Sequence, residues 1–227
     1  MKKYKYDVSF ILPCLNEELT LEKTINEIKN VIKENKLKAE IIVVDNGSFD
    51  NSYNIACKCL VDVYLCKNKG YGNALRYGFL KAKGKYIIMG DADTTYNFYD
   101  SIKMIEKLDD GYDFIMGNRY LGGMERKAMK KSHYYGVKFL SFVGRIKYGV
   151  KLGDFHCGLR AFKASLLKKV KFSSNGMEFA TEMIAKFRNF KVCEIPTELR
   201  RCNEDRKNHL RTIRDGFRHL LFILLKK

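Results

Sequence analysis

Short apolar runs alternate with helix-like patterns through the first half of the chain. The runs at residues 40–45 and 86–91, Glu-Ile-Ile-Val-Val-Asp and Tyr-Ile-Ile-Met-Gly-Asp, are almost continuously apolar, which is typical of parallel strands covered by helices on both faces. This alternation predicts an α/β fold with an open, Rossmann-like, mostly parallel sheet flanked by helices. The predicted strands are residues 6–13, 39–45, 61–67, 85–91 and 112–117, and the predicted helices are residues 20–35, 51–60, 72–82 and 98–108.

The second half of the chain has a different pattern. Residues 126–153 contain eight basic residues and no acidic one, interleaved with aromatic and aliphatic side chains. This pattern predicts a basic amphipathic helix or a pair of such helices. Further along, we expect a motif-rich segment at 154–162, a helix at 178–190, a strand at 191–199, a polar loop at 200–207 and a second basic amphipathic helix at 210–225.

The composition describes a folding chain without a membrane span. Hydrophobic residues make up 46% of the 227 positions, yet the longest unbroken apolar stretch is the six residues 220–225. That is far below the roughly 20 residues that a spanning helix needs. The apolar run at 8–12 is too short for a signal-peptide core and ends at Pro13, so we expect a cytoplasmic protein. Seven scattered cysteines without a CxxC pair favour reduced thiols over a zinc site.

A strong positive charge indicates an anionic partner. The 43 Lys and Arg residues against 26 Asp and Glu give a net charge of +17. Nucleic acid, anionic lipid headgroups and phosphorylated small molecules would all suit this charge. A nucleic-acid-binding protein would carry basic and aromatic residues on an exposed sheet or groove helix. Here they lie between motifs that look catalytic, so we expect no nucleic-acid partner.

Polar groups gather at the carboxyl ends of the five predicted strands. In an open α/β sheet these ends form the crevice in which ligands bind, so their convergence predicts a binding site. The groups are Asn16-Glu17, Asp45-Asn46-Gly47-Ser48, Asn68 to Gly70, Asp91-Ala92-Asp93 and Asn118-Arg119.

Carboxylates at two of these strand ends have predicted roles, one in cation binding and one in nucleoside binding. Asp91 and Asp93 can hold a hard divalent cation that bridges the oxygens of a diphosphate. Asp45, followed by a tight Gly47-Ser48 turn, can accept hydrogen bonds from a nucleobase or ribose, although a capping role for the turn is the alternative. The later Gly-Tyr-Gly turn at residues 70–72 lacks the third glycine of a dinucleotide fingerprint, so NAD binding is not expected.

The order of these motifs resembles a known family. The motifs are Ile11-Leu12-Pro13-x-x-Asn16-Glu17, Val43-Val44-Asp45-Asn46-Gly47-Ser48, Gly70-x-Gly72-x-Ala74, Asp91-Ala92-Asp93 and Gly117-Asn118-Arg119-Tyr120. Together they resemble family 2 glycosyltransferases of the GT-A fold. Residues 154–162, 176–183 and 194–196 are similar to the dolichyl-phosphate mannose synthase, or polyprenyl-phosphate hexosyltransferase, branch, and residues 209–216 to a bacterial and archaeal subgroup of it. The resemblance covers roughly residues 6–222.

The resemblance implies roles for individual residues on the donor side. It implies a nucleotide-sugar donor and a Mg²⁺ or Mn²⁺ cofactor held by Asp91 and Asp93, with Asp93 catalytic. His209 and Arg211 match a basic loop that closes over the diphosphate. The positions that match the nucleotide-binding loops are Pro13, Asn16, Glu17, Asp45 and Gly70, with Asp45 facing the base. Asn46 departs from the usual second Asp of its motif.

The resemblance also implies an inverting transfer of a hexose, from a donor of the UDP-glucose or GDP-mannose type, to a polyprenyl or dolichyl phosphate. Arg119 and Arg160 are the candidates for positioning the acceptor, with a structural tie of Arg160 to Asp154 as the alternative. A neutral hydroxyl acceptor would need a general base, for which Asp154 and Glu178 are the candidates. The competing hypothesis is a soluble family 2 enzyme that acts on a sugar, a phosphorylated small molecule or a protein.

We expect one domain over residues 1–227. Residues 1–123 form the donor-binding half, and residues 124–227 form an acceptor-binding half that faces the membrane. Many relatives carry C-terminal transmembrane helices, which this sequence does not contain, so we expect peripheral association with an anionic membrane surface on the cytoplasmic side. The basic aromatic stretch at 126–153 and the terminal helix would lie in the headgroup layer.

Overall fold

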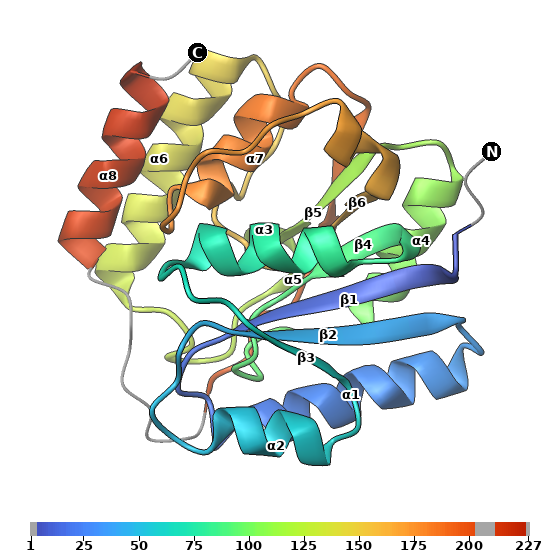
Figure 1. Ribbon diagram of the computed structural model, residues 1–227. Coiled ribbons are helices and arrows are strands. Elements are labelled where there is room, and N and C mark those ends of the chain that lie inside the picture. Colours follow the sequence, from blue (N-terminus) through green and yellow to red (C-terminus); the bar gives the residue numbers. More distant parts are fainter. Residues whose placement is uncertain (1–3, 203–211, 226–227) are drawn as a thin grey trace.

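A seven-stranded sheet forms the centre of the computed structural model, which describes residues 4–202 and 212–225, without the side chains of 212–215 (Figure 1). The strand order is β3-β2-β1-β4-β6-β5-β7, and every pairing is parallel except the two that β6 makes. The predicted mostly parallel sheet is therefore confirmed. The strands are β1 (Tyr6–Cys14), β2 (Ala39–Asp45), β3 (Asp62–Leu65), β4 (Gly84–Met89), β5 (Phe114–Asn118), β6 (Arg160–Lys163) and β7 (Val192–Pro196).

Helices cover both faces of the sheet, which explains why the strands are apolar throughout. In β2, Ile41 and Val43 pack into the core under α1, α2 and α4, while Ile42 and Val44 pack into the opposite core under α3, α6, α7 and α8. The helices are α1 (Leu21–Glu34), α2 (Ser52–Lys58), α3 (Tyr71–Lys81), α4 (Asp100–Asp109), α5 (Arg119–Gly122), α6 (Lys131–Tyr148), α7 (Phe179–Phe187) and α8 (Thr212–Leu225), with a short 3-10 helix at Ala164–Lys168.

The sequence pattern did not predict strand β6, the short helix α5 or the 3-10 helix at Ala164–Lys168, and of these β6 matters most for the site. It lies antiparallel between β4 and β5, and its first residue, Arg160, pairs with both Met89 and Met116. Because β6 runs in the opposite direction, its amino end lies beside the carboxyl ends of its neighbours. The segment that precedes it, residues 154–159, is thereby brought to the edge of the sheet where the predicted binding loops lie.

Within the basic stretch at 126–153, where a helix or a pair was expected, residues Lys131–Tyr148 form one helix, α6. It ends at Gly149, whose φ of +65° suits a glycine. Helices α6 and α8 lie side by side at one edge of the molecule (Figure 1). Across the described residues, no helix combines the length and apolar character needed to cross a bilayer.

Two glycines let the 154–159 segment pack closely. A Cβ at Gly144 of α6 would lie 2.2 Å from the ring of Phe155, and a Cβ at Gly158 would lie 2.7 Å from a carboxylate oxygen of Asp91. Both distances are too short for a side chain. The segment is therefore held between α6 and the end of β4, with the side chains of Phe155, Cys157 and Leu159 buried in the core.

Candidate active site

The loops that follow β1, β2 and β3 are linked by side-chain hydrogen bonds. Asn16 exchanges two of them with the β2 loop, accepting from the backbone of Phe49 at 2.8 Å and donating its own N–H to Ser48 Oγ at 3.0 Å. Asn46 donates to the carbonyl of Asn68 at 2.8 Å and accepts from the N–H of Gly70 at 2.7 Å. These bonds bring three of the predicted strand ends into one rigid rim.

Asp45 lies at the bottom of this rim and has one unsatisfied oxygen. Its side chain is buried, and Oδ1 accepts the N–H groups of Gly47 at 2.8 Å and Ser48 at 3.0 Å. Oδ2 is also buried but has no hydrogen-bond partner within the described part of the chain. Because an unpaired buried acceptor destabilises the fold, this oxygen is suited to an N–H donor supplied by a ligand.

Glu17, Pro13 and Gly70 shape the same rim through the backbone. The N–H of Glu17 donates to Ser52 Oγ at 2.8 Å, which ties the start of α1 to α2. Gly70 has a φ of +126°, and a Cβ on it would lie 2.2 Å from the carbonyl of Asn175. Pro13 is a half-buried residue of β1. The predicted partners His209 and Arg211 lie outside the described residues.

Asp91 and Asp93 follow β4, as predicted. Asp91 lines a cavity and accepts a hydrogen bond from the hydroxyl of Tyr71 at 3.2 Å. Asp93 is buried and accepts from both the N–H and the hydroxyl of Thr95. Over the residues that the structure describes, no set of three His, Cys, Asp or Glu side chains comes together as a metal centre. Carboxylate oxygens are of the hard type that divalent cations such as Mg²⁺ prefer.

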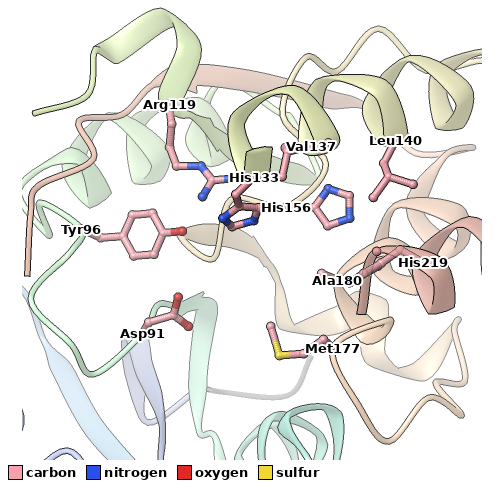
Figure 2. Close-up of a pocket in the computed structure, with 12 residues that line it drawn as sticks. Asp91, Tyr96, Arg119, His133, Val137, Leu140, His156, Met177, Ala180 and His219 are labelled. Carbon is pink, nitrogen blue, oxygen red and sulfur yellow. The ribbon is translucent and has the colours of Figure 1, made fainter. Parts of the chain in front are cut away.

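The cavity beside Asp91 has a volume of about 130 Å³ and is polarised (Figure 2). Asp91 lies on one side, and His133 and His156 lie across the opening from it together with Arg119. Apolar side chains complete the wall on the histidine side. The lining residues are Asp91, Tyr96, Arg119, His133, Gly136, Val137, Leu140, His156, Met177, Ala180, Gly216 and His219.

Arg119 and Asp154 form a buried ion pair at this cavity. Arg119 Nε and Nη2 donate to the two oxygens of Asp154 at 2.6 and 2.8 Å, and both side chains are almost completely buried. Burial by itself would raise the pKa of Asp154, but the adjacent guanidinium outweighs it and holds this pKa below 3.8. Asn118 caps the short helix α5 by accepting the N–H groups of Tyr120 and Leu121, which fixes the backbone of Arg119 between them.

The hypothesis that Arg160 ties the loop to Asp154 is wrong. Arg160 donates instead to the backbone carbonyls of Phe155, Cys157 and Ala180, at 2.6 to 2.8 Å, and its side chain is completely buried. The pairing followed from a short sequence separation, but Arg160 begins β6 and points into the core, whereas Asp154 faces the end of β5. Arg160 thus holds the 154–159 segment in place through its hydrogen bonds to the backbone carbonyls of Phe155 and Cys157.

Glu178, the other candidate base, is also engaged. Its Oε1 accepts the N–H of Gly176 at 3.2 Å and a guanidinium N–H of Arg218 of α8 at 3.3 Å. Its Oε2 lies 3.2 Å from Arg218 but is buried without a hydrogen-bond partner among the described residues. Glu178 directly precedes α7, so this ion pair connects α8 to the loop beside the cavity.

No sequence motif indicated the histidines that line the cavity. Three of the four in the chain, His133, His156 and His219, line this one cavity. They come from α6, from the segment before β6 and from α8, so no local motif contains two of them. The only signal that the sequence contained for these residues was that the chain has just four histidines beside 43 Lys and Arg residues.

The sequence model described as glycosyl transferase family 2 matches residues 9–171. A low-salt glycan biosynthesis hexosyltransferase of Haloferax volcanii is 32% identical over 222 residues, which cover 96% of this chain and 53% of the relative. The chain therefore spans about half the length of that relative. The dolichol-phosphate mannosyltransferase of Pyrococcus furiosus is 29% identical over 222 residues, covering 94% of this chain and 62% of the relative.

A third relative and a solved structure extend the comparison. The dolichyl-phosphate hexose transferase of Haloferax volcanii is 25% identical over 202 residues, covering 88% of this chain and 86% of the relative. Glucosyl-3-phosphoglycerate synthase of Mycobacterium tuberculosis, crystallised with Mn²⁺ and UDP, superposes with a TM-score of 0.75 at 20% identity, covering 97% of this chain and 79% of that chain. At this identity the likeness concerns the fold.

Proposed function

The chain belongs to glycosyl transferase family 2, and on this premise we propose that it moves a hexose from a nucleoside-diphosphate sugar to the phosphate of a polyprenyl lipid. The donor is of the UDP-glucose or GDP-mannose type, and the transfer inverts the anomeric carbon. Residues 1–123 bind the donor in this proposal, and residues 124–227 bind the acceptor. Support for the acceptor class comes from relatives whose names specify dolichyl or undecaprenyl phosphate.

Asp45 supports the donor assignment. Its Oδ2 is buried without a partner among the described residues, at the bottom of a rim that three strand ends share. The ring N–H of a uracil or guanine base would satisfy this oxygen. Because Oδ1 is already held by two backbone N–H groups, the carboxylate is oriented before the base arrives, which lowers the entropy cost of binding.

Asp91 and Asp93 are the residues that would hold Mg²⁺ or Mn²⁺. Carboxylates are hard oxygen donors that suit these ions, Asp91 lies at the cavity, and several solved structural neighbours were crystallised with one ion or the other. The cation would neutralise the charge that develops on the departing nucleoside diphosphate. Tyr71, whose hydroxyl donates to Asp91 Oδ1, orients this carboxylate.

The engagement of both candidate bases is the observation that carries the acceptor proposal. Asp154 is paired through both oxygens with Arg119, and Glu178 is paired with Arg218. A hydroxyl acceptor would have to lose a proton to a base, whereas a phosphate monoester is already an anion at neutral pH. An acceptor that needs no deprotonation therefore suits this cavity.

In this mechanism the protein positions the acceptor and leaves the proton balance unchanged. A phosphate oxygen attacks the anomeric carbon from the face opposite the diphosphate, one C–O bond forms, and the C–O bond to the leaving group breaks. Arg119, aligned by Asp154 at the cavity wall, directs positive charge toward the attacking phosphate. Arg160 contributes by holding the 154–159 segment through three backbone carbonyls.

The outer surfaces of α6 and α8 support a peripheral membrane location. Exposed apolar side chains recur at helical spacing on α6 and continue on α8, and exposed Lys131, Lys138 and Arg145 flank them. Such a surface is typical of helices that lie in the headgroup layer of an anionic bilayer, and we propose the cytoplasmic face as its location. The apolar side chains are Tyr135, Phe139, Phe142 and Ile146 on α6, and Phe217, Leu221, Leu224 and Leu225 on α8.

The test is a matrix of donors and acceptors. Purified protein is incubated with UDP-glucose, UDP-N-acetylglucosamine or GDP-mannose, with Mg²⁺ or Mn²⁺, and with or without undecaprenyl phosphate in detergent micelles. We expect release of nucleoside diphosphate and transfer of labelled sugar into the lipid phase for one donor, only when the lipid phosphate is present. Transfer to glycerol 3-phosphate or 3-phosphoglycerate in preference to the lipid would overturn the lipid acceptor.

A further inference from the structure

The imidazole of His156 has two buried nitrogens without a hydrogen-bond partner in the described part of the chain. Buried polar groups are nearly always satisfied, because an unpaired one loses its hydrogen bonds to water without replacement. His156 also lines the cavity beside Asp91. Its ring therefore lies at the cavity with two nitrogens that are available for hydrogen bonds to a ligand.

Neighbouring residues hold this ring in place. The backbone N–H of His156 donates to Asp154 Oδ1 at 3.2 Å, and the adjacent N–H of Phe155 donates to Ser141 Oγ of α6 at 3.1 Å. The ring lies edge-to-face on His219, with centroids 4.4 Å apart. Nδ1 of His219 forms a 2.9 Å hydrogen bond with Thr181 Oγ1 of α7. The ring of His156 is thus oriented by three elements.

The side chains around His156 offer an anion hydrogen-bond donors more than net charge, because Asp154 shares the charge of Arg119 and burial lowers the pKa of His133. Arg119 and His133 line the same wall, and Asp91 lies across the cavity (Figure 2). Burial lowers the pKa of His156 far below 6.5, and the charges of His219 and Arg119 lower it further. The ring is therefore neutral at neutral pH, with one N–H to donate. A phosphate oxygen would accept this hydrogen bond beside the guanidinium of Arg119, which already shares its charge with Asp154.

The remainder of this wall favours a phosphate that carries an apolar chain. Val137 and Leu140 of α6 line the cavity on the side of His156, and Met177 lines it further away (Figure 2). On the outer face of the same helix, Phe139 and Phe142 are exposed. A chain that leaves the cavity over α6 would thus pass from one apolar surface to another. A sugar, with hydroxyls on all sides, has less to gain from this wall.

We propose that His156, together with His133, binds the phosphate group of the acceptor, and that His219 is a positioning residue for the ring of His156. This inference rests on the proposed function for the identity of the acceptor. The binding chemistry, a phosphate monoester opposite Asp91, can be examined without any transfer reaction.

The direct test follows the histidine side chains of the wild-type chain by ¹H–¹⁵N NMR. Saturating UDP or GDP with Mg²⁺ first occupies the donor loops, and citronellyl phosphate is then added, with citronellol as the control that lacks phosphate. We expect the His156 and His133 signals to shift with the phosphate and to stay unchanged with the alcohol. Glycerol 3-phosphate distinguishes a free phosphate from a lipid one, and equal affinity for it would mean that the apolar chain adds nothing.

Variants add a kinetic readout. His156→Leu should raise the acceptor KM about tenfold to a hundredfold, the range expected for one hydrogen bond to a charged group, with little change in the donor KM. His156→Gln retains a donor N–H and should recover part of this loss. His219→Leu should raise the acceptor KM less and should broaden the His156 signal. A rise in the donor KM instead would assign His156 to the sugar and overturn the proposal.

The NMR and transfer measurements distinguish an error in the phosphate site from an error in the proposed function. If the wild-type signals of His156 do not respond to citronellyl phosphate while the protein transfers sugar to undecaprenyl phosphate, the phosphate site is wrong and the function stands. If the signals respond but no sugar is transferred, the site stands and the proposed function is wrong. Neither result depends on whether the variants fold.

Discussion

The two proposed binding regions are built differently. We call the linked loops after β1, β2 and β3 the donor rim, and the cavity wall with Arg119 and the histidines the acceptor wall, after the ligands that we propose for them. On the donor side, residues close to the ends of β1, β2 and β3 bond to one another's backbone, as Asn46 does with Asn68 and Gly70. On the acceptor side, Arg119, His156 and His219 come from elements that are far apart in the sequence. Parallel strands bring their ends together automatically, whereas the acceptor wall depends on the reversed strand β6 and on the packing of α6 against α8.

The largest effect is expected at Asp91. Asp91→Asn keeps an oxygen for the Tyr71 hydroxyl but removes the charge that a divalent cation requires. Hexose transfer should fall about a thousandfold or more, since metal-assisted charge stabilisation contributes several kcal/mol to the transition state. The measurement is the rate of labelled lipid formation at saturating donor, alongside the melting temperature.

Asp110→Asn, in the exposed turn after α4, is the matched control and should change neither quantity. Excess EDTA should reproduce the defect in the wild type. Undiminished transfer in EDTA would contradict the metal role of Asp91 and Asp93.

The buried pair of Arg119 and Asp154 tests whether the acceptor wall depends on charge. Asp154→Asn leaves the guanidinium buried without its counter-charge and should lower the free energy of unfolding by about 3–5 kcal/mol. Because the pKa of Asp154 lies below 3.8 in the folded state, the ion pair stabilises the protein above that pH and is lost as the pH falls below it. The difference between wild type and variant, measured by urea unfolding, should therefore shrink below about pH 4. A difference that is constant from pH 7 to pH 3 would mean that the charge of Asp154 contributes nothing.

The contrast between the two sides also explains what the sequence could predict. The apolar run at 40–45 matches β2 at nearly every position. Asp45 ends β2 and Asp91 follows β4 as expected, because parallel strands with local loops leave a local pattern. Strand β6 has four residues, begins with a buried arginine and ends with a lysine, so it carries no alternation to recognise. The pairing of Asp154 with Arg119 in place of Arg160 follows from the direction of that strand.

On the donor side, a substitution at Asp45 measures how much its unpaired buried oxygen, Oδ2, contributes to donor binding. Asp45→Asn preserves an acceptor for the Gly47 and Ser48 N–H groups but would present an NH₂ group where the base N–H is expected. The donor dissociation constant, measured by calorimetry with the nucleoside diphosphate, should rise about tenfold to a hundredfold. The rate constant at saturating donor should change little, because a base contact is similar in the ground and transition states. Asp62→Asn, exposed at the start of β3, is the control, and an unchanged donor affinity in Asp45→Asn would limit that residue to shaping its turn.

The smallest effect is expected at the outer surface of the acceptor side. Lys131 begins α6, is exposed, and flanks the apolar side chains Tyr135 and Phe139. A basic residue near an anionic bilayer contributes roughly 1 kcal/mol, so Lys131→Gln should weaken binding to phosphatidylserine-containing vesicles about fivefold at low salt. The difference should diminish in 0.5 M salt, where screening shortens the range of the charges. Lys36→Gln, after α1 and thus on the opposite face of the sheet, is the control for overall charge. If both variants weaken binding equally, the attraction comes from the net charge of +17 alone, and α6 has no privileged orientation toward the lipid.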